Sequence, residues 1–267
     1  MSYWLNTYKD DCELDFWKIE NGRFYPKKYS FNPNDEHQNI ADSIADNLIK
    51  INGIKSVYLR GSVLESKKVE LRRDIDIIVF FNSNEITDKI ERDVMSIKDK
   101  YLLMTNLHID LVLVSVCDFI FFKKNSLLKI IIINRSLLLR GEPVFNLDES
   151  VDINEALLDN LLKSHIKNFE HQLWHLTSLG YANEHKYTSW FQKSALRFGA
   201  ILSLKQFGLY SRDPYTCTYL IRNIFYELTN LSQDVFISYC KNSLTNNACE
   251  KAVTLFAELQ ERSNLGN

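Results

Sequence analysis

Two aspartates at the start of an apolar run have the type and spacing of ligands for a hard divalent cation. Asp74 and Asp76 flank a single isoleucine, and the run continues to Phe81. Because side chains of a β-strand alternate between its faces, Asp74 and Asp76 share one face, while Ile75 and Ile77 point the other way into a core. Carboxylate oxygens are the ligands that Mg²⁺ prefers in proteins, so this pair predicts half of a magnesium site.

A third aspartate, Asp110, is the only acidic residue in the apolar run from Leu107 to Val114. This run has the length and composition of a β-strand. A carboxylate buried in such a strand is rarely left without a partner. Either an arginine or lysine neutralises Asp110 or a metal ion does, and the metal is favoured because two more carboxylates are expected nearby.

The order of these residues resembles the DNA polymerase beta type of nucleotidyltransferase, whose signature is Gly-Ser, then Asp-x-Asp, then a third carboxylate on a neighbouring strand. Here Gly61-Ser62 is followed after 11 residues by Asp74-Ile75-Asp76, with Asp110 as the third member. The resemblance covers residues 37 to 145. It implies that the three aspartates bind Mg²⁺ and transfer a nucleoside monophosphate from ATP or another nucleoside triphosphate.

The resemblance also implies contacts to the phosphates of the nucleotide. Gly61 lets the backbone approach a phosphate with no side chain in the way, and Ser62 adds its hydroxyl and a backbone N–H. Two arginines are candidates for the triphosphate, Arg60 before the glycine and Arg73 before the first aspartate. Arg73 is the better candidate, although many relatives have serine at its position.

Positive charge for the outer phosphates is expected from the second half of the chain. Lys193 and Arg197 in W-F-Q-K-S-A-L-R-F-G are one helical turn apart and share a helix face. Many two-domain relatives use a lysine on such a helix, whereas a solvated Lys–Arg face is the alternative. No single residue stands out as the base for the attacking hydroxyl. The candidates are Asp110 itself, Glu170, His171, His175, Glu184 and His185. The loop with Arg212 and Asp213 is a further candidate to face the active-site cleft expected between the two domains.

Apolar periodicity predicts the elements that carry these residues. Strands are expected over 54–59, 74–81 and 107–114, and helices from Asn34 to Gly53 and over 85–100. The segment 135–145 resembles the one that closes the catalytic domain in this family, which implies that a helix ends there in a small turn. From residue 152 onward helical spacing prevails. Helices are expected to 180, over 187–207 and over 217–228, with one or two more over 234–259.

The expected fold class is therefore α+β. With the resemblance, residues 1–146 are expected to form a mixed-sheet nucleotidyltransferase domain, and residues 147–267 are expected to form a helical bundle. The aromatic-rich residues 1–33 are either an arm packed across the body or a wall that stacks on a base or substrate.

Composition limits the function classes. A net charge of −2 argues against a general nucleic-acid binder, which needs a clustered positive surface. The 5 cysteines are widely spaced with no C-x-x-C pair, so neither a disulfide framework nor a zinc site is expected. No signal peptide and no apolar run long enough to span a membrane is recognised, so a cytoplasmic protein without membrane partners is expected.

Size and a helical second domain resemble the aminoglycoside and lincosamide adenylyltransferases. The resemblance implies Mg²⁺-dependent transfer of AMP from ATP to a hydroxyl of a small-molecule acceptor, with an antibiotic as one candidate. Two alternatives stay open: a toxin-like nucleotidyltransferase acting on tRNA or protein, and a regulatory module that binds nucleotide without turnover. The acceptor, the nucleobase and the oligomeric state are left open by the sequence.

Overall fold

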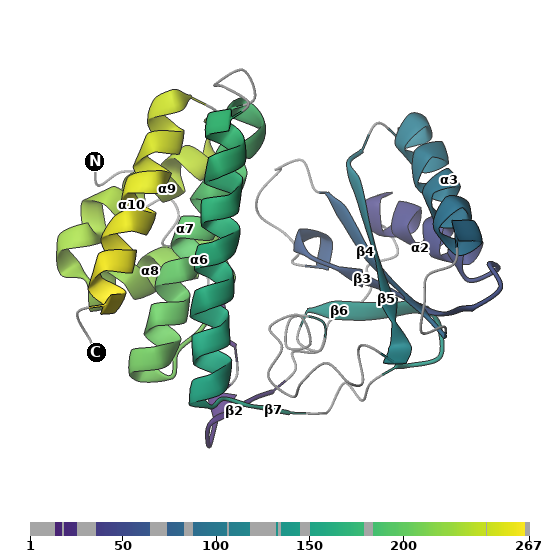
Figure 1. The fold of residues 1–267 in the computed structure, drawn as a ribbon, viewed down its shortest axis with the longest axis horizontal. Helices are drawn as coiled ribbons and strands as arrows, with labels where there is room; N and C mark the ends of the chain where they lie inside the picture. Colours follow the sequence, from purple (N-terminus) through teal and green to yellow (C-terminus); the bar gives the residue numbers. More distant parts are fainter. Residues whose placement is uncertain are drawn as a thin grey trace. The chain divides into compact units, whose positions relative to one another are not determined.

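The chain divides into two compact units in the computed structural model (Figure 1). One unit is Arg23–Ile153, and the other combines Asn154–Asn267 with the N-terminal residues Met1–Gly22. The sequence-based division had assigned the whole N-terminal arm to the catalytic domain instead. The structure describes residues 14–17, 19–25, 36–64, 74–82, 88–105, 107–117, 132, 135–144, 150–178, 184–243 and 245–264.

The first unit is built on a four-stranded mixed sheet with the order β5-β4-β3-β6. Strand β4 pairs in parallel with β5, whereas β3 pairs antiparallel with both β4 and β6. This mixed sheet, followed along the chain by helices, confirms the α+β class. The strands are β3 (Ile54–Arg60), β4 (Ile75–Phe81), β5 (Ile109–Ser115) and β6 (Ser136–Gly141).

Helices α2 (Glu36–Leu48) and α3 (Asp88–Thr105) cover one face of this sheet (Figure 1). Apolar residues of the strands and of the two helices form a single core. Every second side chain of a strand, and every third or fourth side chain of a helix, points into it. Apart from the segment 135–145, the predicted strands and helices of this unit are confirmed, with ends that differ by about five residues at most. The core includes Ile44, Leu48, Val57, Leu59, Ile75, Ile77, Val79, Ile90, Val94 and Ile109.

The segment 135–145 was predicted wrongly. Its run of leucines suits a helix, yet Ser136–Gly141 forms strand β6 against β3. Leu139 is buried in the core of the sheet unit. The strand forms because pairing with β3 satisfies its backbone and buries apolar area, which outweighs helix propensity.

Arg140 fixes β6 to helix α2. Its Nη1 lies 2.6 Å from Asp42 Oδ1, and its Nε lies 2.6 Å from Asp46 Oδ1. The hydrogen bond from Arg140 lowers the pKa of Asp46 below its usual range. This ion-paired group joins the edge strand to the helix layer.

The second unit is helical, as predicted. Helix α7 contacts α6, α8, α9 and α10, and is therefore its central helix. At Gly199, an added Cβ would lie 2.2 Å from Cγ1 of Ile221, so only glycine permits the close packing of α7 on α8. The elements are α6 (Glu155–Ser178), α7 (Glu184–Phe207), α8 (Pro214–Ile224), the 3₁₀ turn η3 (Tyr226–Leu228), α9 (Thr229–Cys240) and α10 (Asn246–Asn264).

The described residues of the N-terminal arm pack on the helical unit. The backbone N–H of Trp17 donates to the carbonyl of Tyr210 at 3.0 Å, and the two rings meet edge to face at 4.9 Å. The Ser211 hydroxyl donates to the Asp15 carbonyl at 2.7 Å. These contacts agree with an arm packed on the body.

The short strands β2 (Arg23–Phe24) and β7 (Val151–Asp152) lie where the chain leaves and re-enters the helical unit. They pair antiparallel, and Nε of Arg23 lies 2.5 Å from Oδ1 of Asp152. The turn before β2 contains Asn21 and Gly22, both with positive φ, following β1 (Ile19–Glu20).

Membrane-spanning helices and cysteine pairing can be examined in the described residues. In that part of the chain, no helix is both long and apolar enough to cross a membrane. Four of the cysteines, Cys117, Cys217, Cys240 and Cys249, are free thiols.

Candidate active site

Strand register brings two of the predicted aspartates together. Asp76 of β4 is the direct register partner of Asp110 on the parallel strand β5. The N–H of Ile75 donates to the carbonyl of His108 at 2.9 Å, which fixes this register where the two strands begin. Since Ile75 and Ile109 both belong to the core under the helices, Asp76 and Asp110 lie on the opposite face of the sheet. The predicted inward orientation of the isoleucines is therefore confirmed.

Arg60 extends this row onto a third strand. It is the register partner of Asp76 on β3, and its Nη2 lies 3.8 Å from Oδ2 of Asp110. The side chain of Arg60 is 22% exposed and that of Asp110 is 46% exposed. Within the described residues, the buried Nε of Arg60 has no hydrogen-bond partner. One cation is thus available to Asp110, the first of the two alternatives that the sequence left open.

The conformation of residue 61 and the nearby Asp76 carboxylate both require a glycine at this position. Its φ is +85°, a left-handed conformation that side chains disfavour, and a Cβ added there would lie 2.3 Å from Oδ2 of Asp76. Gly61 then leads into the 3₁₀ turn Ser62–Leu64, in which the N–H of Leu64 donates to the Gly61 carbonyl at 3.1 Å. Gln38 of α2 holds this turn by donating to the Val63 carbonyl at 3.2 Å. The glycine therefore leaves room for Asp76, a reason that sequence reasoning missed.

Asp74 lies just before β4, and its carboxylate is close to the side chain of His108. Its Oδ1 lies 3.9 Å from Nδ1 of His108, and both side chains are more than half exposed. His108 was not singled out by the sequence. The available signal was its place before the strand of Asp110, because β4 and β5 begin side by side.

The fit of this row to Mg²⁺ rests on donor type and space. Asp76 and Asp110 supply hard oxygen donors in register, and the lack of a side chain at Gly61 leaves room for the Asp76 carboxylate. No three acidic, histidine or cysteine side chains form a metal-binding group within the described residues. The paired carboxylates fit the cation, and the three-aspartate site stays a prediction.

The predicted phosphate-binding residues of the second unit both lie on one helix, as expected. Lys193 and Arg197 are both partly buried on α7. Nε of Arg197 donates to the carbonyl of Arg212 at 3.3 Å, which brings these two arginines together. Their role toward phosphate stays a prediction. Arg73 lies outside the described residues, as does the side chain of Ser62.

Of the remaining candidate bases and cleft residues, Asp213 has a structural role, and no contact within the described part of the chain assigns a role to the others. Asp213 caps helix α8, accepting from the Thr216 N–H at 2.7 Å and from its hydroxyl at 2.8 Å. Glu170 is exposed on α6, and His171 and His175 of that helix contact each other. The side chains of Glu184 and His185 lie outside the described residues.

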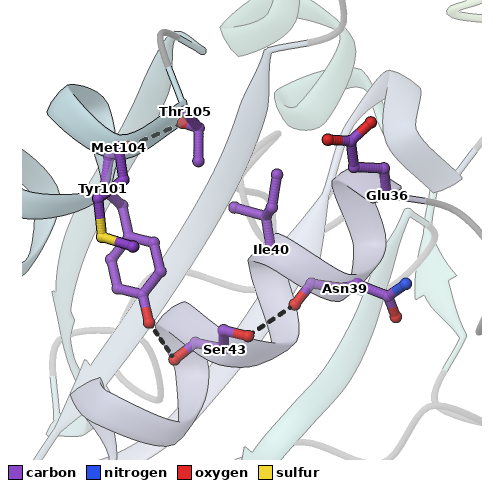
Figure 2. A pocket seen from close by; sticks show the side chains of 7 residues that line it. All are labelled: Glu36, Asn39, Ile40, Ser43, Tyr101, Met104 and Thr105. Atoms are coloured by element: carbon purple, nitrogen blue, oxygen red, sulfur yellow. Dashed lines mark hydrogen bonds between the residues drawn. The ribbon is translucent and has the colours of Figure 1, made fainter.

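A pocket of about 380 Å³ lies between α2 and α3, away from the aspartates (Figure 2). The Tyr101 hydroxyl donates to the Ser43 carbonyl at 3.0 Å at its base. These helices cover the sheet face opposite Asp76 and Asp110, so the pocket is not part of the candidate active site. Its lining residues are Glu36, Asn39, Ile40, Ser43, Tyr101, Met104 and Thr105.

The comparisons with known proteins agree with this geometry. Residues 41–139 match the family model described as nucleotidyltransferase domain, a range that includes Gly61, Asp74, Asp76 and Asp110. No curated protein matches the chain significantly. The fold is similar to the crystal structure of spectinomycin adenyltransferase AAD(9) from Enterococcus faecialis with ATP and spectinomycin, with a TM-score of 0.54 and 15% identity, over 84% of this chain and 98% of that one. At this identity the likeness shows the fold. The chain therefore carries, at residues 41–139, a nucleotidyltransferase domain of the DNA polymerase beta-like superfamily, and it is a nucleotidyltransferase.

Proposed function

We propose that this enzyme transfers AMP from ATP to a hydroxyl of a small-molecule acceptor, in a Mg²⁺-dependent reaction that releases pyrophosphate. The observation that carries the proposal is the register pairing of Asp76 with Asp110 on adjacent parallel strands. Gly61, which leaves room for the Asp76 carboxylate, supports the same site.

Bound Mg²⁺ would polarise the α-phosphate and lower the pKa of the attacking hydroxyl. Asp76 and Asp110 are the residues proposed to hold it, with Asp74 as the third ligand. The acceptor oxygen bonds to the α-phosphorus, the bond to the β-phosphate oxygen breaks, and the hydroxyl proton passes to a base. Asp110, which is 46% exposed, is the candidate base within the sheet.

The phosphate contacts are proposed from both halves of the chain. The backbone after Gly61, including the Ser62 N–H, together with Arg73 would contact the phosphates near the metal. Lys193 and Arg197 would neutralise the outer phosphates, because they share one face of α7. Lys193→Ala should weaken binding of ATP more than binding of AMP in isothermal titration. Lys205→Ala, which removes an exposed lysine from the last turn of the same helix, is the matched control; equal losses for ATP and AMP would remove the proposed role.

The acceptor proposed is an aminoglycoside-like or related antibiotic carrying free hydroxyls. Support comes from the similar fold of a protein named spectinomycin adenyltransferase, whose structure contains ATP and spectinomycin. The net charge of −2 gives no general attraction to a polynucleotide, which disfavours tRNA.

The test is incubation with ATP labelled on the α-phosphate and separate pools of aminoglycosides with spectinomycin, of tRNA, and of cell protein. Label in a small-molecule product, absent with Asp76→Asn, supports the proposal. Label in tRNA or protein would replace the acceptor class while keeping the reaction. Nucleotide that binds without pyrophosphate release in any pool would favour a regulatory module.

A further inference from the structure

Two histidines on helix α6 face each other through their outer ring nitrogens. His171 and His175 are one helical turn apart, and their Nε2 atoms are 3.2 Å apart. The ring centroids are 4.4 Å apart with an angle of 80° between the planes. His171 is exposed and His175 is partly buried, so solvent reaches the pair from the helix surface.

The two nitrogens form a hydrogen bond with each other, and their separation also allows both to bind one metal ion in place of the shared proton. Zinc–histidine bonds are about 2.0–2.1 Å long, so two of them ending on nitrogens 3.2 Å apart enclose an angle of about 100° at the metal. That angle is close to the tetrahedral value, so both nitrogens can bind one ion after the two side chains rotate, with the helix unchanged. The i, i+4 spacing on a helix face is also the spacing by which two histidines bind zinc in metalloprotease helices.

We propose that His171 and His175 form a two-histidine site for a transition-metal ion, with Zn²⁺ as the expected occupant and water completing its coordination. The donor set separates this site from the magnesium site proposed on the sheet. Imidazole nitrogen suits zinc, nickel and copper, whereas Mg²⁺ prefers carboxylate, carbonyl and water oxygens. The inference is therefore independent of the proposed function.

Trp174 provides a reporter for this site. Its ring is 63% exposed and meets the ring of His175 edge to face at 5.0 Å. Ni²⁺ or Cu²⁺ bound to His175 would lie within a few ångströms of the indole and quench its fluorescence. The variant Trp174→Phe should lose this quenching signal but still bind the metal.

The first measurement is a titration of the untagged full chain with Zn²⁺ by calorimetry and with Ni²⁺ by fluorescence, in the presence of excess Mg²⁺. His171→Ala and His175→Ala should each weaken binding about a hundredfold, because the second ligand of a chelate binds with a high effective concentration. Asp76→Asn with Asp110→Asn should leave the Zn²⁺ affinity unchanged. Loss of affinity in that double variant would move the metal to the sheet and overturn the proposal.

Two variants with the same number of histidines sharpen the test. Glu170→His with His171→Ala spaces the rings i, i+5, which points them apart, so binding should stay as weak as in His171→Ala. Lys167→His with His175→Ala restores the i, i+4 spacing one turn earlier, so binding should return. Parent-like affinity in the i, i+5 variant, or no gain in the i, i+4 variant, would show that the pair does not chelate.

Discussion

The two units hold their ionisable side chains in opposite ways. On the sheet, Asp76 and Asp110 are partly exposed beside Arg60, in a row across three strands. In the helical unit, the His165 ring lies against Phe198 and Phe256 at 5.7 and 6.2 Å, and its Nε2 is 2.9 Å from the Ser194 carbonyl.

Burial lowers the pKa of His165 to about 4, opposed by the hydrogen bond to Ser194 and assisted by the charges of Arg197 and Arg212. The ring is therefore neutral at physiological pH, whereas the carboxylate row stays within reach of water and of a cation. The comparison indicates that the carboxylates of the sheet are accessible to a ligand, whereas His165 is a packing group of the helical core.

The largest effect is expected for Asp76→Asn. Replacing one of the two carboxylates removes a negative oxygen from the candidate metal site, so nucleotidyl transfer should fall by about a thousandfold. The free energy of unfolding should be unchanged or slightly higher, because two adjacent carboxylates repel each other. Steady-state kinetics and urea unfolding measure the two quantities.

Asp99→Asn is the matched control, since Asp99 is exposed on α3 of the same unit. It should leave both quantities unchanged. If Asp76→Asn lowered the free energy of unfolding enough to account for its loss of activity, the role of Asp76 would be structural. The contrast between the two units would then disappear.

Acid should act first on the helical unit. Between pH 6.5 and about 4 the unfolded state binds a proton on His165 that the folded state does not. The free energy of unfolding therefore falls as the pH is lowered through this window, by up to about 3 kcal/mol. His165→Gln, which keeps an amide donor for Ser194, should remove this part of the pH dependence in urea unfolding. An unchanged slope would contradict the neutral buried ring.

Gly61→Ala tests whether the glycine serves Asp76. The added Cβ would lie 2.3 Å from Asp76 Oδ2, so the carboxylate must shift, and activity should fall by about a hundredfold. Gly208→Ala is the matched control, because Gly208 also has positive φ but meets no atom within 4 Å. Both variants carry the strain of a left-handed alanine, so similar kinetics for the two would remove the special role of Gly61.

The smallest effect is expected for Gly199→Ala in the helical unit. The new methyl group would overlap Cγ1 of Ile221, so the free energy of unfolding should fall by about 1–3 kcal/mol. Combining it with Ile221→Ala should cost less than the sum of the two single changes, because the space vacated by Ile221 accommodates the methyl. Strict additivity in thermal or urea unfolding would contradict the contact.

The parts of the fold that follow from local periodicity were predicted well. The stripe Ile90 and Val94 marks the buried side of α3, and Ile75 and Ile77 mark the buried face of β4. On α6, Leu157 and Leu161 are buried, whereas their neighbours Leu158 and Leu162 are only partly buried. Adjacent leucines leave the sequence without a unique helical phase.

The rest depends on pairing between distant segments. Strand β6 could not be recognised from a run of leucines, because its conformation is fixed by its partner β3. The contacts of Asp110 with Arg60 and of Asp74 with His108 follow from strand register, which a single sequence does not encode locally. The aspartates could be predicted from their spacing, whereas the neighbours that hold them could not.

The helical unit takes residues from both ends of the chain, since Trp17 hydrogen-bonds with Tyr210. During synthesis the sheet unit, which is continuous from Arg23 to Ile153, can fold as soon as it leaves the ribosome. The N-terminal segment must wait until Tyr210 and helix α8 are made. A fragment ending near residue 146 would therefore retain the sheet but leave its first residues without their native binding surface.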